Sequence, residues 1–116
     1  MIVRALIIRP EPLDRILSGE KTWELRGSRT HVRGRIGLIA SGSGHIVGEA
    51  HLVDCIGPLD AATYARNLGR HRSDRPFEEQ YPQLFAWVLE GAQRIDPRPY
   101  AHPQGAIIWV TLPDEW

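Results

Sequence analysis

Lys21 is the only lysine in a chain of 116 residues that also holds thirteen arginines. It lies in the run of residues 19–26, GEKTWELR, together with Trp23, Glu24 and Arg26. A lysine can lose its proton when a pocket lowers its pKa, whereas an arginine stays charged. This short run therefore combines an amine, a carboxylate, a guanidinium and an indole, which are the groups needed for acid–base chemistry, anion binding and base stacking.

Two chemical roles are open to Lys21. As a general base or nucleophile it must be neutral near pH 7, so its pKa must fall by roughly 3 units, a cost of about 4 kcal/mol. Burial and Arg26 favour the neutral amine, whereas Glu24 opposes it. The alternative leaves Lys21 charged to bind a phosphate or an oxyanion while Glu24 accepts the proton. We favour the second role, in which Lys21 and Glu24 form the catalytic pair if the protein is an enzyme.

A purely structural interpretation of the same run is also open. Lys21 would then complement the dipole at a helix end, and Glu24 and Arg26 would form a surface ion pair. Trp23 fits either a core position or an exposed stacking surface, because most aromatic side chains are buried.

Basic residues gather in two further stretches of a chain whose formal net charge is zero. Either stretch could be an ordinary solvated face, or a local anion-binding face balanced by acids elsewhere. The first contains Arg26, Arg29, His31, Arg33 and Arg35, and the second contains Arg66, Arg70, His71, Arg72 and Arg75.

Several classes of site are not expected. Cys55 is the single cysteine, and no two of the five histidines are spaced i, i+4, so we predict no metal. Gly42 and Gly44 lack the third glycine of a dinucleotide loop, and we predict no cofactor. No apolar run approaches the roughly 20 residues of a membrane span, and the N-terminus lacks a signal-peptide pattern, so we expect no membrane contact and a cytoplasmic location.

The elements that position this run are short. We expect a strand over 2–8, a helix that starts at Pro12 and ends at Gly19, and a strand over 22–26 that directs Glu24 and Arg26 to one face. A second helix should follow the N-cap Asp60 and stop at Gly69. The remaining strands are expected at 35–40, 46–56 with a bulge, 84–89 and 107–112, with a turn at 41–44 and an irregular connection over 91–105. These elements predict a single domain over 1–116, of α+β class, built as a small mixed β-barrel of five to six strands with two or three short helices.

The run 19–26 resembles the signature of the ASCH domain, Gly-x-Lys-x-x-Glu-x-Arg, at each fixed position: Gly19, Lys21, Glu24 and Arg26. Residues 8–18 are similar to the family's entry strand and helix, and residues 85–89 and 103–109 to its last strands. The resemblance implies a barrel like that of PUA domains, with a cleft beside the motif. It also implies binding of RNA or of modified bases.

Some small ASCH proteins are similar to ribonucleases, and others are amidohydrolases that act on N4-acetylcytidine. In those amidohydrolases the motif lysine is catalytic and a threonine stands where this chain has Glu24. A second acid comes from a later segment, for which Glu78 or Glu79 is the candidate here.

Our leading hypothesis is an RNA- or nucleotide-binding module that recognises a base or phosphate in the cleft. The alternatives are a metal-independent hydrolase of a modified nucleoside or of single-stranded RNA, and a protein-binding adaptor. The expected ligand contacts are Lys21, Trp23, Glu24, Arg26, Arg29 and Ser41.

Overall fold

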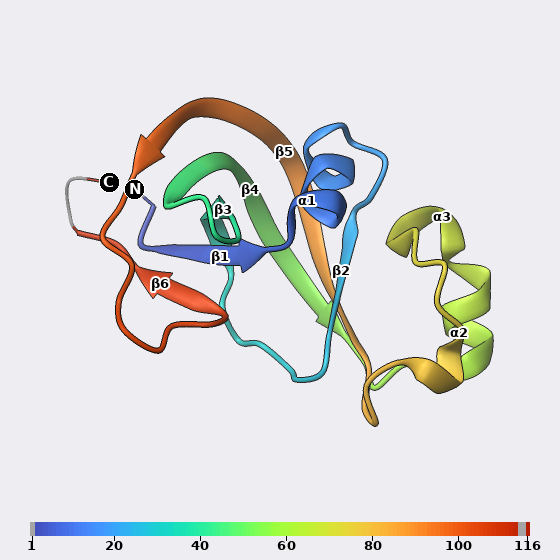
Figure 1. The fold of residues 1–116 in the computed structure, drawn as a ribbon. Coiled ribbons are helices and arrows are strands. Elements are labelled where there is room, and N and C mark those ends of the chain that lie inside the picture. The colour runs from blue at the N-terminus through green and yellow to red at the C-terminus, as the bar shows by residue number, and fades with distance from the viewer. Residues whose placement is uncertain (1, 114–115) are drawn as a thin grey trace.

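A computed structural model describes residues 2–113 and residue 116 of the chain (Figure 1). Six strands form one sheet in the order β2-β5-β4-β3-β1-β6, in which β1 and β3 are parallel and the other neighbours antiparallel. The elements in chain order are β1 (Arg4–Ile8), α1 (Pro10–Leu17), β2 (Trp23–Arg26), β3 (Gly34–Ala40), β4 (His45–Ile56), α2 (Ala61–Arg66), α3 (Leu68–His71), the 3-10 helix η1 (Phe77–Glu79), β5 (Phe85–Pro99) and β6 (Trp109–Thr111).

The sheet curls into a half-barrel, because the two long strands β4 and β5 bend around the core (Figure 1). Their pairing shifts register at three places, and the β3–β4 pairing shifts once, as expected for the predicted bulge in residues 46–56. Within the described residues, the edge strands β2 and β6 do not pair with each other. The predicted class, α+β with a mixed, barrel-like sheet and short helices, is confirmed.

The largest core cluster fills the concave side of the half-barrel and includes Leu6, Leu38, Leu52 and Trp87. Helix α1 closes one end of this cluster with its buried face of Leu13, Ile16 and Leu17. A separate cluster packs Trp23 with Leu59, Tyr64, Leu84 and Ala86, and so attaches α2 to the back of β2 and β5.

Strand β5 is longer than the sequence predicted. We expected a strand over 84–89 and an irregular connection over 91–105, but β5 continues through Pro97 to Pro99. Beyond Leu89 the strand pairs only with β4, since β2 reaches no further than Val88. Proline is tolerated where one side of a strand needs no hydrogen bonds, so its absent N–H costs little here.

The helices also differ in their bounds. Helix α1 begins at Pro10 rather than Pro12, because both prolines fit a first turn whose N–H groups have no partner within the helix. Asp60 does cap α2, accepting a hydrogen bond from the Thr63 N–H at 2.7 Å. The predicted stop at Gly69 is wrong: α2 ends at Arg66, and α3 continues to His71. It is followed by Arg72, whose φ of 56° lies in the left-handed region.

Three backbone hydrogen bonds fix the motif segment between α1 and β2. The Lys21 N–H donates to the Arg15 carbonyl at 3.0 Å, which turns the chain back after Gly19 (φ 87°). The Thr22 N–H donates to the Arg70 carbonyl at 3.0 Å, and the Leu89 N–H donates to the Thr22 carbonyl at 2.8 Å. The motif is therefore held by α1, by the end of α3 and by β5 at once.

The final strand is shorter than the predicted 107–112, because β6 pairs with β1 only over Trp109–Thr111. None of the helices in the described part of the chain is long and apolar enough to cross a bilayer.

Candidate functional site

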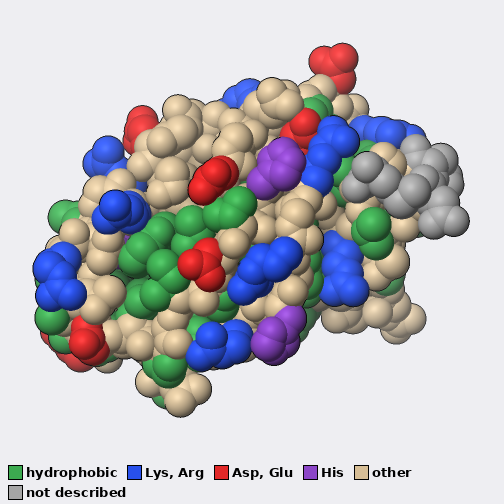
Figure 2. Space-filling model, turned by 180° about the vertical axis from the view of Figure 1, so that it is seen from behind, with side chains coloured by type: hydrophobic (Ala, Val, Ile, Leu, Met, Phe, Trp, Pro, Cys, Tyr) green, Lys and Arg blue, Asp and Glu red, His purple; other side chains and the backbone are tan. Residues whose placement is uncertain are grey.

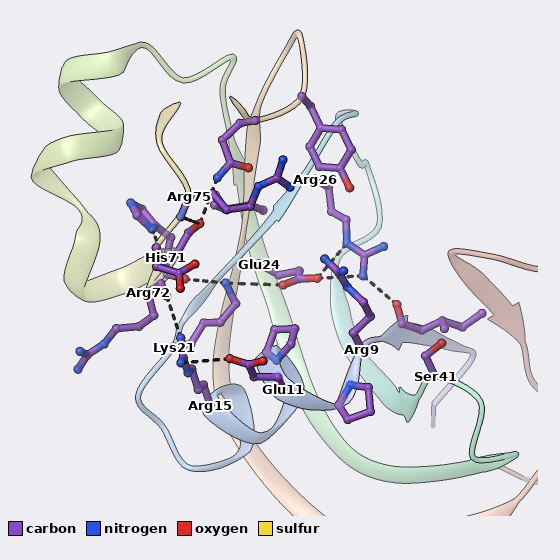
Figure 3. A pocket seen from close by; sticks show the side chains of 18 of the residues that line it. Arg9, Glu11, Arg15, Lys21, Glu24, Arg26, Ser41, His71, Arg72 and Arg75 are labelled. Carbon is purple, nitrogen blue, oxygen red and sulfur yellow. Dashed lines mark hydrogen bonds and ion pairs between the residues drawn. The ribbon is translucent and has the colours of Figure 1, made fainter. Parts of the chain in front are cut away.

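A cavity of about 950 Å³ lies between α1, β2 and the segment of residues 71–81. Of the residues that the sequence predicted, Lys21, Glu24, Arg26 and Ser41 line this cavity (Figure 3). We call it the motif cavity.

Glu24 lies between two cations at the buried side of the motif cavity. Its Oε1 is 3.7 Å from Lys21 Nζ, and its Oε2 is 2.9 Å from an Arg26 guanidinium nitrogen. Arg26 Nε also donates to Oε2 at 3.0 Å. Figure 3 shows Lys21 and Arg26 approaching the carboxylate from opposite sides. Because Lys21 and Glu24 are only 6% and 7% exposed, these pairs are shielded from solvent.

The amine of Lys21 is already surrounded by oxygens of the protein. It donates to the Trp23 carbonyl at 2.6 Å and to the His71 carbonyl at 2.7 Å, and Glu24 is its third neighbour. Burial lowers the pKa of Lys21, whereas Glu24 counteracts this by stabilising the charged form. An ammonium has three N–H donors and no acceptor, so three oxygen neighbours match the charged form. The arrangement therefore makes Lys21 a buried cation that ties β2 to the end of α3.

Arg26 connects β2 to the other side of the half-barrel. One of its terminal nitrogens donates to the Ile7 carbonyl of β1 at 2.8 Å. Its guanidinium also lies over the Trp87 ring, 5.5 Å from the centroid. The predicted ligand contact thus has structural partners on three sides, and the cavity is left with one edge of the guanidinium.

His71 is a buried residue of the site that the sequence analysis placed only in a basic stretch. It is 1% exposed and stacks on Tyr64 with ring centroids 4.2 Å apart. Its Nδ1 accepts the Ser73 N–H at 3.0 Å, so its Nε2 carries the proton that is donated to the Tyr64 carbonyl at 2.8 Å. Burial lowers the pKa of His71, and the positive charge of Lys21 lowers it further, whereas the hydrogen bond to the Tyr64 carbonyl raises it. His71 is therefore a neutral residue that shapes the cavity wall.

The lining of the motif cavity has more positive than negative charge. Besides Lys21 it includes five arginines, whereas only three carboxylates line it, which leaves an excess of three positive charges. The arginines are Arg9, Arg15, Arg26, Arg72 and Arg75, and the carboxylates are Glu11, Glu24 and Asp74.

Two lining residues that the sequence analysis did not single out are available to a ligand. Arg9 has no hydrogen bond or ion pair to any other side chain or carbonyl in residues 2–113 and 116. Tyr81 is 53% exposed, and its ring lies against the backbone of Gly27, where even a Cβ would meet the ring at 2.8 Å. Neither residue is near the motif in sequence, so only the folded chain brings them to it.

Four predicted residues do not reach the motif cavity. Trp23 is 7% exposed and packs in the cluster with Tyr64 and Leu84, because β2 turns this face of the strand toward α2. Arg29 lies over the Phe85 ring and donates to the Gly57 carbonyl at 2.8 Å. The candidate second acids, Glu78 and Glu79, are exposed on η1 and do not line the cavity, whereas Asp74 and Glu11 do.

No group of three histidine, cysteine, aspartate or glutamate residues within the described residues is placed to hold a metal ion. The cationic lining itself disfavours a metal and favours an anion.

The chain matches a known family model and is similar in fold to solved structures. A family model of the ASCH domain matches residues 6–99. The fold is similar to the crystal structure of ASCH from Zymomonas mobilis, with a TM-score of 0.71 and 22% sequence identity over 97% of this chain and 88% of that chain. A tyrosine-to-phenylalanine and a serine-to-alanine mutant of the Zymomonas mobilis protein match with TM-scores of 0.69 and 0.70 at 23% and 24% identity. Both matches cover 97% of this chain, and they cover 91% and 89% of the two mutant chains.

No curated protein matches the chain. The family model nevertheless spans most of its length and contains the whole motif from Gly19 to Arg26, so this chain belongs to the ASCH domain family.

Proposed function

We propose that the motif cavity binds a nucleotide within single-stranded RNA. Membership of the ASCH family supports a nucleic-acid-binding role at a coarse level. The observation that carries the finer proposal is the excess of three positive charges around a cavity of about 950 Å³, in a chain whose formal net charge is zero. A cavity of this size accommodates a base, a ribose and a phosphate.

The phosphate contacts in this proposal come from the exposed arginines. Arg9 is not engaged by other residues of the described chain, and Arg75 uses one terminal nitrogen to donate to the Glu79 carbonyl at 2.7 Å. Each guanidinium has five N–H donors in a planar fork, so both retain donors for phosphate oxygens.

The base contact comes from Tyr81 rather than from Trp23, which was the aromatic candidate in the sequence. A half-exposed ring that lines the cavity offers a stacking surface, and stacking tolerates any base. Ser41 and Glu24 Oε1, the carboxylate oxygen that Arg26 does not occupy, offer groups that accept hydrogen bonds from a base edge.

An acid–base role for Lys21 and Glu24 has less support from the geometry. A base needs a lone pair that reaches the substrate, but the Lys21 amine is directed at two carbonyls and a carboxylate. Glu24 Oε2 is likewise taken by two nitrogens of Arg26. Ligand binding leaves these contacts unchanged, whereas a proton transfer by Lys21 or Glu24 requires some of them to break.

Fluorescence anisotropy with a labelled uridylate trimer tests the proposal. We expect binding that weakens with salt, and we expect the double substitution Arg9→Gln and Arg75→Gln to reduce the slope of log K against log salt by about 1.4, for two phosphate contacts on a single strand. Tyr81→Ala should weaken binding by roughly 1–3 kcal/mol and leave the slope unchanged, because it removes stacking only.

The matched control is the double substitution Arg66→Gln and Arg94→Gln, which removes the same charge from exposed positions outside the cavity. Equal affinity loss in both double variants, or no binding of the trimer by the unaltered protein, would overturn the proposal.

A further inference from the structure

A second cavity, of about 630 Å³, lies at the opposite end of β1 from the motif cavity. Its walls come from the start of β1, the connection between β2 and β3, the start of β3 and the start of β6. Its lining includes Arg4, Arg29, His31, Arg33, Arg35 and Trp109. Nothing in the proposed function uses this site.

The second cavity is lined by four arginines, and no aspartate or glutamate is among its lining residues, all of which the structure describes. Arg35 alone meets a carboxylate, that of Glu49, to which its Nε donates at 3.0 Å. Arg33 donates to the Thr30 and Val32 carbonyls of its own loop, at 3.0 and 2.8 Å. The side chain of Arg4 has no hydrogen bond or ion pair in the described part of the chain. Guanidinium groups gathered with so few counter-charges favour an anionic ligand.

An aromatic row links the second cavity to the motif cavity. The Trp109 ring lines the second cavity and stacks on Trp87, with centroids 5.7 Å apart and planes inclined by 11°. Trp87 also contacts the Arg26 guanidinium, which lines the motif cavity. A row of packed planar groups, Trp109, Trp87 and Arg26, therefore connects the linings of the two cavities.

The surface between the cavities is also short. Ile107 lines the motif cavity and is 79% exposed, and Trp109 lines the second cavity two residues later. On the paired strand, Arg4 and Ile7 belong to the second and the first cavity respectively, and three residues of β-strand span about 10 Å. At roughly 3.4 Å per nucleotide in a stacked strand, this gap is bridged by about three nucleotides.

We propose that the second cavity binds the phosphates of nucleotides that flank the one held in the motif cavity. The ligand class is then a single-stranded RNA of several nucleotides rather than a free nucleotide. This inference rests on the proposed function, because the strand needs the motif cavity as its first point of attachment. The arginines of the second cavity contact the backbone, and the partly exposed edge of Trp109 contacts a base.

Anisotropy titrations with a uridylate trimer and a uridylate decamer test the inference. The trimer fills the motif cavity alone, whereas the decamer reaches both. We expect the decamer to bind the unaltered protein more than about tenfold more tightly, beyond the statistical gain of overlapping registers, because its second contact is intramolecular. Its salt slope should be steeper as well. The double substitution Arg4→Gln and Arg33→Gln should reduce the decamer slope by about 1.4 and remove most of the length advantage, with trimer affinity unchanged.

Arg66→Gln with Arg94→Gln again serves as the charge-matched control, and it should keep the full length advantage. Because Arg33 also holds its own loop, Arg4→Gln alone is the second variant. It should reduce the decamer slope by about half as much as the double substitution does. A decamer that binds no more tightly than the trimer, or a length advantage that survives the Arg4 and Arg33 substitutions, would overturn the inference and leave the proposed function intact. Absence of trimer binding would instead remove the proposed function on which the inference depends.

Discussion

Lys21 keeps its charge inside the protein because three oxygens surround its amine. Two of them are the carbonyl oxygens of Trp23, in β2, and of His71, at the end of α3. A buried ammonium without such partners would lose its proton or unfold the site. The residue that looked most like a catalytic base in the sequence is therefore, in the fold, a cross-link between β2 and the end of α3.

Lys21→Met should lower the free energy of unfolding by about 3–5 kcal/mol, because it leaves two buried carbonyls without donors and breaks a buried ion pair. Urea denaturation measures this change. The paired measurement combines Lys21→Met with Glu24→Gln. Because the Lys21–Glu24 pair is already lost in the single Lys21 variant, the double variant should lose less stability than the sum of the two single substitutions. A single variant as stable as the unaltered protein would show that Lys21 is not a structural cation.

The motif residues could be predicted from sequence, but their neighbours could not. Lys21, Glu24 and Arg26 are close in the chain, and the alternation of a strand is enough to place the last two on one face. Arg9 and Tyr81 approach them only through the packing of α1 and the folding of residues 71–81 over the motif. The sequence left open whether Trp23 is a core residue, because alternation shows which residues share a face and does not show which face is covered.

At the scale of elements, the segment from α3 to η1 acts as a cover over the motif. It is attached by the Thr22–Arg70 backbone hydrogen bond, by the Lys21 amine and by Arg15, which donates to the Arg72 carbonyl at 3.0 Å. His71 is the last residue of α3 in this segment. Its ring accepts one backbone hydrogen bond and donates another, and so it fixes the path of the chain on both sides.

This geometry predicts a pH-dependent stability. The pKa of His71 is lowered in the folded state by burial, so the stability it contributes is complete above its ordinary value of 6.5 and is lost as the pH falls through the lower folded value. Protonation also removes the Nδ1 acceptor from the Ser73 N–H. The melting temperature should therefore decrease as the pH is lowered from about 7.5 to about 5, because the buried imidazole is neutral in the folded protein and must be protonated at low pH.

His71→Phe provides the comparison, because phenylalanine retains the stacking on Tyr64 and cannot titrate. This variant should melt at a lower temperature at pH 7.5 but show a flatter dependence on pH. The other four histidines lie outside this segment and remain unchanged in both proteins. The same slope in both proteins would assign the pH dependence to other groups.

The elements were predicted better by type than by extent. Short apolar runs with proline and glycine at their ends indicated most strands and both helical regions. The length of β5 depends on β4, a partner that is distant in sequence, whereas the break at Asn67 accompanies a local contact between the His71 ring and the Tyr64 carbonyl. The turn signal at Gly91 was therefore overridden by tertiary pairing.

For the whole molecule, zero net charge conceals an uneven distribution. Nine arginines line the two cavities. On the face shown in Figure 2, by contrast, acidic and histidine side chains lie between the basic ones, so that positive and negative charges are mixed. A neutral protein with such local fields attracts an anion to one region without general affinity for polyanions. This is the whole-molecule counterpart of the salt dependence expected for RNA binding.

The half-barrel is open between β2 and the β1–β6 pair, and this gap, which we call the seam, lies between the two cavities. Arg26 spans it: the guanidinium is anchored by Glu24 on β2, donates to the Ile7 carbonyl on β1, and covers Trp87. Across the seam, Trp87 stacks on Trp109 of β6. The edge strands of the sheet do not pair with each other within the described residues, and side chains hold the half-barrel closed instead. Arg26 supplies a polar contact across the seam through its hydrogen bond to the Ile7 carbonyl, and the Trp87–Trp109 stack supplies an apolar one.

Arg26→Gln should therefore loosen the β6 side of the molecule more than the rest. Loss of a charged hydrogen bond and of the buried pair should cost about 1.5–3 kcal/mol of stability. The effect should be local in native-state hydrogen exchange, because the amide of Ile7, which donates to the Ile108 carbonyl, would exchange faster while the β3–β4 amides keep their relative protection. Arg29→Gln is the matched control, since that arginine donates to Gly57 and does not cross the seam. Uniform acceleration of exchange across all strands in the Arg26 variant, or the same pattern in the Arg29 variant, would mean that the half-barrel is closed by its core alone.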